Sequence, residues 1–271
     1  MRLRRFAHPI FPTLVALLLL SGGCSASEAK RAAAEGARLY DGGDYEAALP
    51  FLEKAAGKGL KDGELYYQLG YIYALKSMPE KGREYREKAV PLMEKRVASR
   101  EGNLEDAYYL TALFFNLGRT EEMAKAAREA IGRYGEAENL SGEDLFRLGR
   151  LQEFAGDGAK GAAAYRRSVE VFEKGKNPGG TLYALALLAD ARTDFRSHRF
   201  AEASRKFGTV ARVSPRNAPE PFETALAHLG AGEFETARED FGKVQDANLN
   251  TEAQYGADVA RRLQESGGRF W

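Results

Sequence analysis

A few residues in this sequence have types and spacings that could do chemistry. Residues 156–161, Gly-Asp-Gly-Ala-Lys-Gly, fit the pattern G-x-G-x-x-G that cradles a dinucleotide phosphate. That chemistry needs a strand before the loop, whereas here the loop joins two helical patterns. The three histidines, His8, His198 and His228, have no His or Cys partner at metal-ligand spacing. We therefore expect no cofactor and no metal site.

Nucleophilic catalysis has no better support. A serine triad would have to use His198 or His228, and the sequence contains no Gly-x-Ser-x-Gly elbow. Ser197, beside His198, is most simply a turn residue. The sequence therefore predicts a protein that is not an enzyme.

The composition excludes several other classes of protein. The 271 residues include 40 Lys and Arg against 39 Asp and Glu, a net charge of +1, so no nucleic-acid-binding surface is indicated. The single cysteine excludes an internal disulfide framework. A mean hydropathy of -0.46 excludes a polytopic membrane protein but leaves room for one anchor.

The amino terminus has the order of an export signal. Arg2, Arg4 and Arg5 precede a mostly apolar stretch at residues 10–20. A membrane-spanning helix needs about 20 residues, so this stretch is too short to be a permanent span.

With Ser21-Gly22-Gly23 before Cys24, this segment resembles a bacterial lipoprotein signal. The resemblance implies that residues 1–23 are cleaved and that Cys24 is acylated, with palmitate among its chains. Residues 24–28 would then be a lipidated amino terminus and short linker. Ser25, where Asp would favour the inner membrane, implies the periplasmic face of the outer membrane. The alternative is an ordinary secretory signal in which the cysteine has no role.

Similar turn-and-helix segments recur along the rest of the chain. Residues 43–48, Gly-Asp-Tyr-Glu-Ala-Ala, align with residues 232–237 and 197–203, and each segment is a turn that leads into a helix. Apolar helical stretches, such as residues 65–73, lie upstream of these turns. The repeating unit is therefore a helix, a short turn and a second helix.

These units resemble the tetratricopeptide repeat, which implies an all-α fold: a right-handed superhelical solenoid of antiparallel helix pairs. About six units fit within residues 29–251, and a capping helix and aromatic tail follow at 252–271. The units start near Ala29, Gly63, Leu104, Gly142, Ala184 and Ala218, at spacings of 34, 41, 38, 42 and 34 residues. The three longer spacings imply insertions near residues 97–103, 134–141 and 175–181, which we expect to be loops.

The repeat alignment also predicts which residues pack inside each helix pair. Small residues are expected where the two helices cross, and most of those positions hold glycine or alanine, with Thr111 and Met123 as exceptions. Large buried side chains are expected at Leu52, Tyr165, Phe207 and Phe241. In the capping helix, we expect an apolar stripe formed by Tyr255, Val259 and Leu263. The tail residues Phe270 and Trp271 either pack back on this helix or form a docking peptide.

In the tetratricopeptide family the first helices line an inner groove that holds a ligand, so the resemblance implies a partner-binding groove here. Aromatic residues beside arginine are the types that carry binding energy in interfaces. The Lys and Asn pattern with which this family clamps a carboxyl-terminal peptide is missing. The expected groove residues are Tyr67, Tyr71, Tyr108, Phe115, Asn116, Phe146, Arg150, Phe154, Arg192, Phe195, Arg196 and Phe222. The alternative is that several of these rings pack between neighbouring repeats.

The leading interpretation is therefore a non-enzymatic adaptor in the cell envelope. It would be anchored by Cys24 and would bind a segment of another envelope protein, in the assembly or positioning of that protein. The alternative is a scaffold for peptidoglycan enzymes that uses the convex face and the loops. Self-association through exposed apolar surface remains open.

Overall fold

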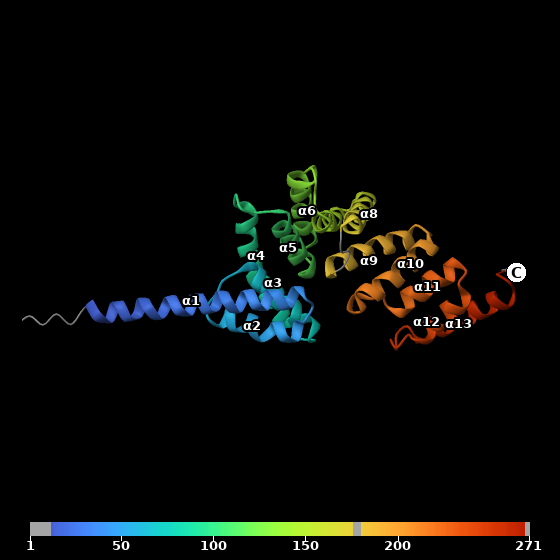
Figure 1. Ribbon diagram of the computed structural model, residues 1–271, viewed down its shortest axis with the longest axis horizontal. Coiled ribbons are helices and arrows are strands. Elements are labelled where there is room, and N and C mark those ends of the chain that lie inside the picture. The colour runs from blue at the N-terminus through green and yellow to red at the C-terminus, as the bar shows by residue number, and fades with distance from the viewer. Residues whose placement is uncertain (1–11, 176–179, 269–271) are drawn as a thin grey trace, which may run out of the picture. The chain divides into compact units, whose positions relative to one another are not determined.

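The computed structural model describes residues 12–175 and 180–268, in which all regular structure is helical (Figure 1). These residues form thirteen α helices and one 3-10 helix, η1 (Pro215–Asn217), so the expected all-α solenoid of helix pairs is confirmed. Residues 2–5, 8 and 270–271, which the sequence singled out, lie outside the described part.

The chain divides into two compact units. Unit 1 comprises residues up to Gly102 together with Ala112–Arg119, and unit 2 comprises Asn103–Thr111 and the residues from Thr120 onward. The helices of unit 1 are α1 (Pro12–Asp41), α2 (Tyr45–Gly57), α3 (Gly63–Leu75) and α4 (Pro79–Ala98). The division between the units falls within α5 (Leu104–Asn116).

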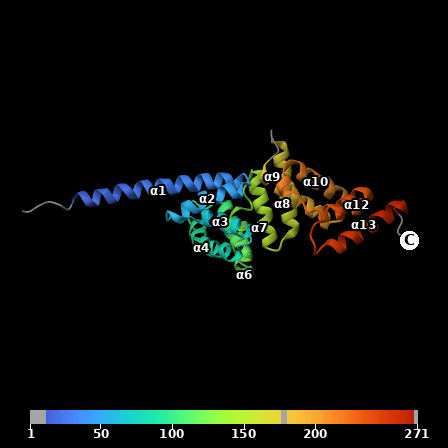
Figure 2. The ribbon, with the colours of Figure 1, turned by 90° about the horizontal axis from the view of Figure 1, so that it is seen from below.

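Unit 2 continues the helix pairs to the end of the described chain. Its helices are α6 (Thr120–Tyr134), α7 (Gly142–Phe154), α8 (Gly158–Lys174), α9 (Thr181–Arg196), α10 (Phe200–Val213), α11 (Pro221–Ala231), α12 (Phe234–Gly242) and α13 (Asn250–Glu265). Helix α7 packs against α8, α9 against α10 and α11 against α12, and α13 packs on α12 (Figure 2). In unit 1, α1 packs against α2 and α3 against α4.

A residue with positive φ follows the first helix in every repeat and confirms the predicted spacings. At this point the chain reverses direction, and a left-handed residue allows the next amide to bond back to the end of the first helix. For example, the Asp44 amide donates to the Leu39 carbonyl at 2.9 Å, and the Asp157 amide to the Gln152 carbonyl at 2.8 Å. The six residues are Gly43, Ser77, Gly118, Gly156, His198 and Gly232, which are 34, 41, 38, 42 and 34 residues apart.

Glycine allows a close approach where two of the helix pairs cross. A Cβ atom on Gly70 would lie 3.0 Å from the carbonyl oxygen of Gly82, and one on Gly82 would lie 2.9 Å from the carbonyl oxygen of Gly70. Gly149 and Gly161 show the same reciprocal contacts, at 3.1 and 3.0 Å. At these distances a Cβ atom would push the two backbones apart by a few tenths of an ångström, so the predicted close crossings are confirmed in both repeats.

The predicted large core residues are also confirmed. Leu52, Tyr165 and Phe207 are fully buried and Phe241 is 3% exposed. Met123 differs from the other crossing positions because it is only half-buried.

The insertions are not simply loops. The second helices next to two of them are longer, because α4 has 20 residues and α8 has 17, against 13 in α2. Residues 97 and 98, expected in a loop, therefore belong to α4, and the irregular segment is residues 99–103. Residues 135–141 are irregular as expected, and residues 176–179 lie outside the described part.

The predicted apolar stripe of the capping helix was wrong for Tyr255. The face of α13 that packs inward carries Ala253, Gly256, Ala260 and Leu263, whereas Tyr255 is 72% exposed. A Cβ on Gly256 would lie 2.5 Å from the Phe241 ring, so the helix needs small residues to approach α12 closely. The spacing of large apolar residues therefore predicted the wrong buried face for this helix.

Helix α1 runs through the expected cleavage point. Residues 24–28, expected as a linker, lie inside this helix. Glu28 forms ion pairs with Lys54 and Lys58 of α2, both at 2.7 Å. Hydrogen bonds from these two lysines lower the pKa of Glu28 to about 2. No helix in the described part of the chain is both long and apolar enough to cross a membrane.

Candidate partner-binding surfaces

In unit 2, several of the predicted groove residues meet around one carboxylate. Glu153 on α7 accepts hydrogen bonds from Arg150 at 2.9 Å, from Arg196 of α9 at 3.3 Å and from the Tyr165 hydroxyl at 2.6 Å. Burial opposes the charge of Arg150, but Tyr165, Tyr108 and Glu153 outweigh it and raise the pKa of Arg150. Burial also raises the pKa of Tyr165, which keeps its hydroxyl a donor. The Glu153 carboxylate is therefore held by a tyrosine and two arginines.

A second ion pair continues this surface toward α11. Arg192 of α9 binds Glu223 of α11 through two parallel hydrogen bonds of 2.8 and 2.9 Å. The side chains of Arg192 and Arg196 are 48% and 64% exposed, so both cations also face solvent. Arg150, Arg192 and Arg196 thus pair with two carboxylates, and the surface combines arginines with Tyr108. We call Tyr108, Arg150, Glu153, Arg192, Arg196 and Glu223 the unit 2 surface.

The aromatic residues expected in this groove are less accessible than the sequence indicated. Phe146 and Phe154 are only 6% and 8% exposed, which contradicts their expected place on an open wall. The Phe146 ring packs against Tyr165 with 5.9 Å between centroids, and the Arg150 guanidinium covers Phe154 at 4.8 Å. Phe146 therefore belongs to the core between helices, and Phe154 is covered by Arg150.

The two remaining phenylalanines of the predicted set in unit 2 are half-buried. The Phe195 ring packs edge-on against Phe200 at 5.4 Å, and the Phe222 ring packs edge-on against Phe241 at 5.7 Å. Phe222 also lines an apolar groove of about 490 Å³ near the end of unit 2. Its other large apolar lining residues are Leu226, Leu229, Phe241, Tyr255 and Val259.

Four of the predicted residues belong to unit 1. Tyr71 packs in a three-ring cluster with Tyr40 and Tyr45, whose centroids lie 5.2–5.7 Å apart, and Tyr67 is half-buried on the same helix, α3. On α5, Phe115 is 54% exposed, and the Asn116 amide donates to the Ala112 carbonyl at 2.7 Å.

Arg86 of α4 was not among the residues predicted from the sequence. This arginine occupies the position at which other repeats have the large buried residues Leu52, Tyr165, Phe207 and Phe241. Its side chain is half-buried, and its charge interacts with Tyr67 and Tyr40. The repeat alignment itself could have found it, because a charged residue at an otherwise apolar position is the signal.

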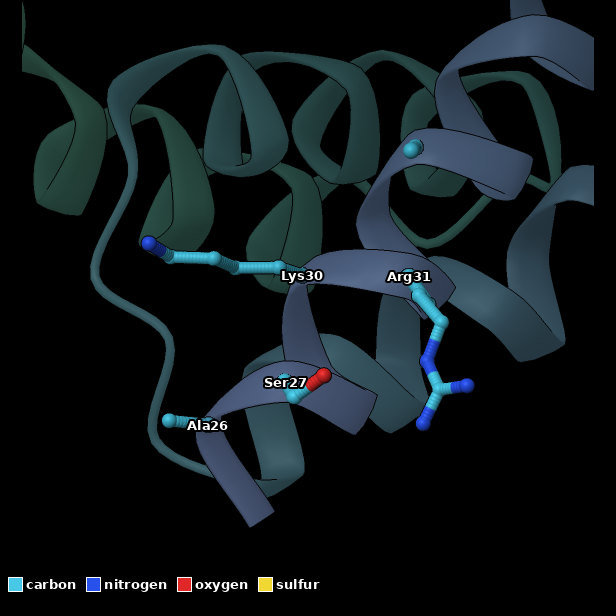
Figure 3. Close-up of a pocket in the computed structure, with 5 residues that line it drawn as sticks. Ala26, Ser27, Lys30 and Arg31 are labelled. Carbon is cyan, nitrogen blue, oxygen red and sulfur yellow. The ribbon is translucent and has the colours of Figure 1, made fainter. Parts of the chain in front are cut away.

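A shallow hollow on α1 does not form a site. Its lining residues Ala26, Ser27, Lys30, Arg31 and Ala34 all come from this one helix. Lys30 and Arg31 extend to opposite sides of α1 and do not converge (Figure 3).

The described residues contain no group of three or more His, Cys, Asp and Glu placed to hold a metal ion. The glycine-rich segment at residues 156–161 joins α7 to α8. It therefore lacks the preceding strand of a dinucleotide site.

Comparison with solved structures identifies the architecture. The chain resembles the crystal structure of the APC/C hetero-tetramer Cut9-Hcn1 at a TM-score of 0.60 and 12% identity, over 90% of this chain and 46% of that one. A thermophilic tetratricopeptide-repeat protein from Thermus thermophilus matches at a TM-score of 0.50 and 17% identity, over 74% of this chain and 99% of that one. The fold is that of tetratricopeptide-repeat proteins. The chain spans less than half the length of the Cut9-Hcn1 chain that it matches. No protein-family model and no curated protein matches its sequence.

Proposed function

We propose that this protein is a non-enzymatic adaptor of the bacterial cell envelope. Acyl chains on Cys24 would hold it at the periplasmic face of the outer membrane. Its unit 2 surface would bind a segment of another envelope protein, in the assembly or positioning of that protein. One structure with this fold is a hetero-tetramer, which supports a role in protein assembly.

The observation that carries this proposal is the pair of exposed arginines on α9. Arg192 and Arg196 form ion pairs with Glu223 and Glu153, which restrain their side chains before any partner arrives. Restrained arginines lose less conformational freedom on binding and can still offer N–H donors to an acidic partner. Tyr108 adds an aromatic side chain near Arg150.

The test compares this surface with the opposite helix of the same repeat. A photo-crosslinking residue replaces Tyr108 or Arg196 in the full chain in living cells, and another replaces Arg205, which is exposed on α10. We expect one envelope protein to be crosslinked from positions 108 and 196 but not from 205.

Charge removal supplies the second arm of this test. Arg192→Ala with Arg196→Ala should reduce crosslinking from position 108 at least tenfold, and Arg205→Ala with Arg212→Ala on α10 should leave it unchanged. Equal crosslinking in both double variants, or crosslinking from position 205 alone, would refute binding at the unit 2 surface. The second of these results would favour a convex-face scaffold.

A further inference from the structure

Two repeats in different units can be aligned residue by residue, because both have glycine at each helix crossing. Gly70 and Gly82 in the α3–α4 pair make the same reciprocal contacts as Gly149 and Gly161 in the α7–α8 pair. In each repeat, the two helices cross at these two glycines, where their backbones are in contact. The surrounding positions of the two repeats are therefore equivalent in space as well as in sequence.

At two of these equivalent positions, an arginine and a tyrosine are exchanged. The repeat in unit 2 has Arg150 on its first helix and Tyr165 on its second, and the repeat in unit 1 has Tyr71 on its first helix and Arg86 on its second. The Tyr165 ring lies 2.6 Å from where the Cβ of the first crossing glycine would be, and the Arg86 Cγ lies 2.7 Å from the corresponding point. Both repeats thus combine one arginine with one tyrosine beside the helix crossing.

The repeats differ in the carboxylate between these groups. In unit 2, Glu153 lies beside the second crossing glycine and is bound by Arg150, Tyr165 and Arg196. The equivalent residue of the unit 1 repeat is Ala74, whose backbone lies beside its own crossing glycine. Unit 1 therefore has the arginine and the tyrosine without the carboxylate.

The surroundings of Arg86 provide rings but no counter-charge. Its guanidinium interacts with Tyr67 and Tyr40, and Tyr40 packs in turn against Tyr45 and Tyr71. Among the described residues, no carboxylate forms an ion pair with Arg86. Burial lowers the pKa of Arg86, and the two tyrosines oppose this only in part. A half-buried cation without a carboxylate partner is stabilised when a carboxylate binds it, because part of the cost of removing the cation from water has already been met on folding.

We propose that Arg86 binds the carboxylate of an Asp or Glu side chain from a partner peptide, which takes the place that Glu153 occupies in the other repeat. An apolar residue beside that acid would pack on the rings of Tyr40, Tyr67 and Tyr71. This unit 1 acid site adds a second contact to the proposed adaptor and rests on that function for its biological partner, but its chemistry can be tested separately.

The first test supplies the carboxylate within the chain. Ala74→Glu places the acid where Glu153 lies in the other repeat, and Ala74→Gln adds the same bulk without charge. We expect Ala74→Glu to raise Tm by about 3 °C relative to Ala74→Gln, and we expect this difference to vanish when both are combined with Arg86→Met. Position 74 lies in the last turn of α3, where a negative charge is disfavoured, so a gain must come from a nearby cation.

The second test uses a phage-displayed library of random decapeptides selected on the purified full chain. We expect the wild type and Ala74→Gln to enrich peptides with an acid next to an apolar residue. Ala74→Glu and Arg86→Met should lose these peptides while their circular dichroism is unchanged. Enrichment of the same peptides by all four proteins, or of no acidic peptides by the wild type, would overturn the proposal, as would equal Tm values for Ala74→Glu and Ala74→Gln.

These results separate the acid site from the adaptor function. Failure of the acid site leaves crosslinking from position 108 in cells unaffected, because that position belongs to unit 2. Failure of the adaptor function removes crosslinking from position 108, whereas the Tm difference and the peptide selection with purified protein remain.

Discussion

Ser77 and His198 adopt a left-handed backbone conformation that glycine adopts in the other four turns. Their φ angles are 57° and 59°. A residue with a Cβ pays about 1–2 kcal/mol in this region, whereas glycine loses about 0.5–1 kcal/mol more backbone entropy on folding. These two turns therefore carry a small strain that the fold tolerates.

Replacing Ser77 by glycine tests this strain directly. We expect Ser77→Gly to raise the free energy of unfolding by about 0.5 kcal/mol, as measured by urea denaturation. The reverse change in an equivalent turn, Gly156→Ala, should lower it by about 1 kcal/mol, because Gly156 has φ 88° and a Cβ there would contact nothing that could compensate. A loss of stability in Ser77→Gly would mean that the serine side chain stabilises the turn.

A buried charge network in unit 2 makes stability depend on pH. Asp194 is 2% exposed and accepts hydrogen bonds from Lys206 at 2.6 Å and from Arg199, and Lys206 also binds the buried Asp190. Burial alone would raise the pKa of Asp194, but Lys206 and Arg199 outweigh it and the pKa is lowered. A lowered folded-state pKa stabilises the protein above the unfolded pKa of about 3.9, and this stabilisation is lost as pH falls through the folded value.

Asp194→Asn should therefore lower the free energy of unfolding most at neutral pH. We expect it to cost about 2 kcal/mol at pH 7, because it leaves Lys206 and Arg199 with a weaker acceptor, and to cost progressively less below pH 4. Thermal unfolding of both proteins from pH 3 to pH 7 measures the difference. Glu239→Gln, on the exposed face of α12, is the control, and a cost for Asp194→Asn that is the same at every pH would contradict the assignment.

At the scale of the helix, α13 is held by small residues and not by its tyrosine. Gly256→Ala should lower the free energy of unfolding by about 1–3 kcal/mol, because the new methyl group would overlap the Phe241 ring. Tyr255→Ser should change it by less than about 0.5 kcal/mol, since this ring is 72% exposed.

Gly132→Ala on α6 is the matched control for the glycine substitution. A Cβ at this helical position meets nothing within 4 Å, so alanine should raise stability by up to about 1 kcal/mol. Urea denaturation of the three variants checks the set. A destabilised Tyr255→Ser together with an unchanged Gly256→Ala would restore the stripe expected from the sequence.

The helix pairs were predictable because their signals are local. Small residues at helix crossings and a turn every 34 to 42 residues fix the period without any long-range information, and the six positive φ angles reproduce it. The longer α4 and α8 were not predictable, because polar residues after a helix are equally consistent with a loop or with an extra exposed turn. The buried face of α13 was missed because close approach selects Gly256 and Ala260 over larger residues.

The candidate surfaces were predicted less well for a related reason. The repeat pattern places Phe146 and Arg150 on the same helix, but it does not say which side chain fills the space between helices. In the structure the ring takes that space, and the arginine pairs with Glu153. Ion pairs such as Arg192 with Glu223 join residues 31 positions apart, which periodicity alone cannot match.

At the scale of the whole molecule, the proposed anchor lies very close to the folded repeats. Ala29 is 2% exposed, and Glu28 is tied to Lys54 and Lys58, so packed structure begins four or five residues after Cys24. A helix rises 1.5 Å per residue, so this distance is only about 6–8 Å.

Cleavage before Cys24 would remove three arginines and no acids, changing the net charge from 40 - 39 = +1 to 37 - 39 = -2. The body would therefore gain no attraction to anionic lipid, and the proposed acyl chains would have to provide the membrane affinity.

Membrane association should therefore depend on Cys24 alone. In bacteria fed an alkyne fatty acid, we expect the full chain to be labelled and to stay in the membrane pellet through a high-salt wash. A version that carries an ordinary secretory signal in place of residues 1–23, together with Cys24→Ser, should be unlabelled and released with the periplasmic contents.

Because the proposed anchor is so near Glu28, inserting ten Gly and Ser residues after Ser25 should leave labelling intact while moving the repeats away from the bilayer. Labelling of the Cys24→Ser version, or wild-type protein in the soluble fraction, would refute the lipid anchor and leave the ordinary secretory signal as the explanation of residues 1–23.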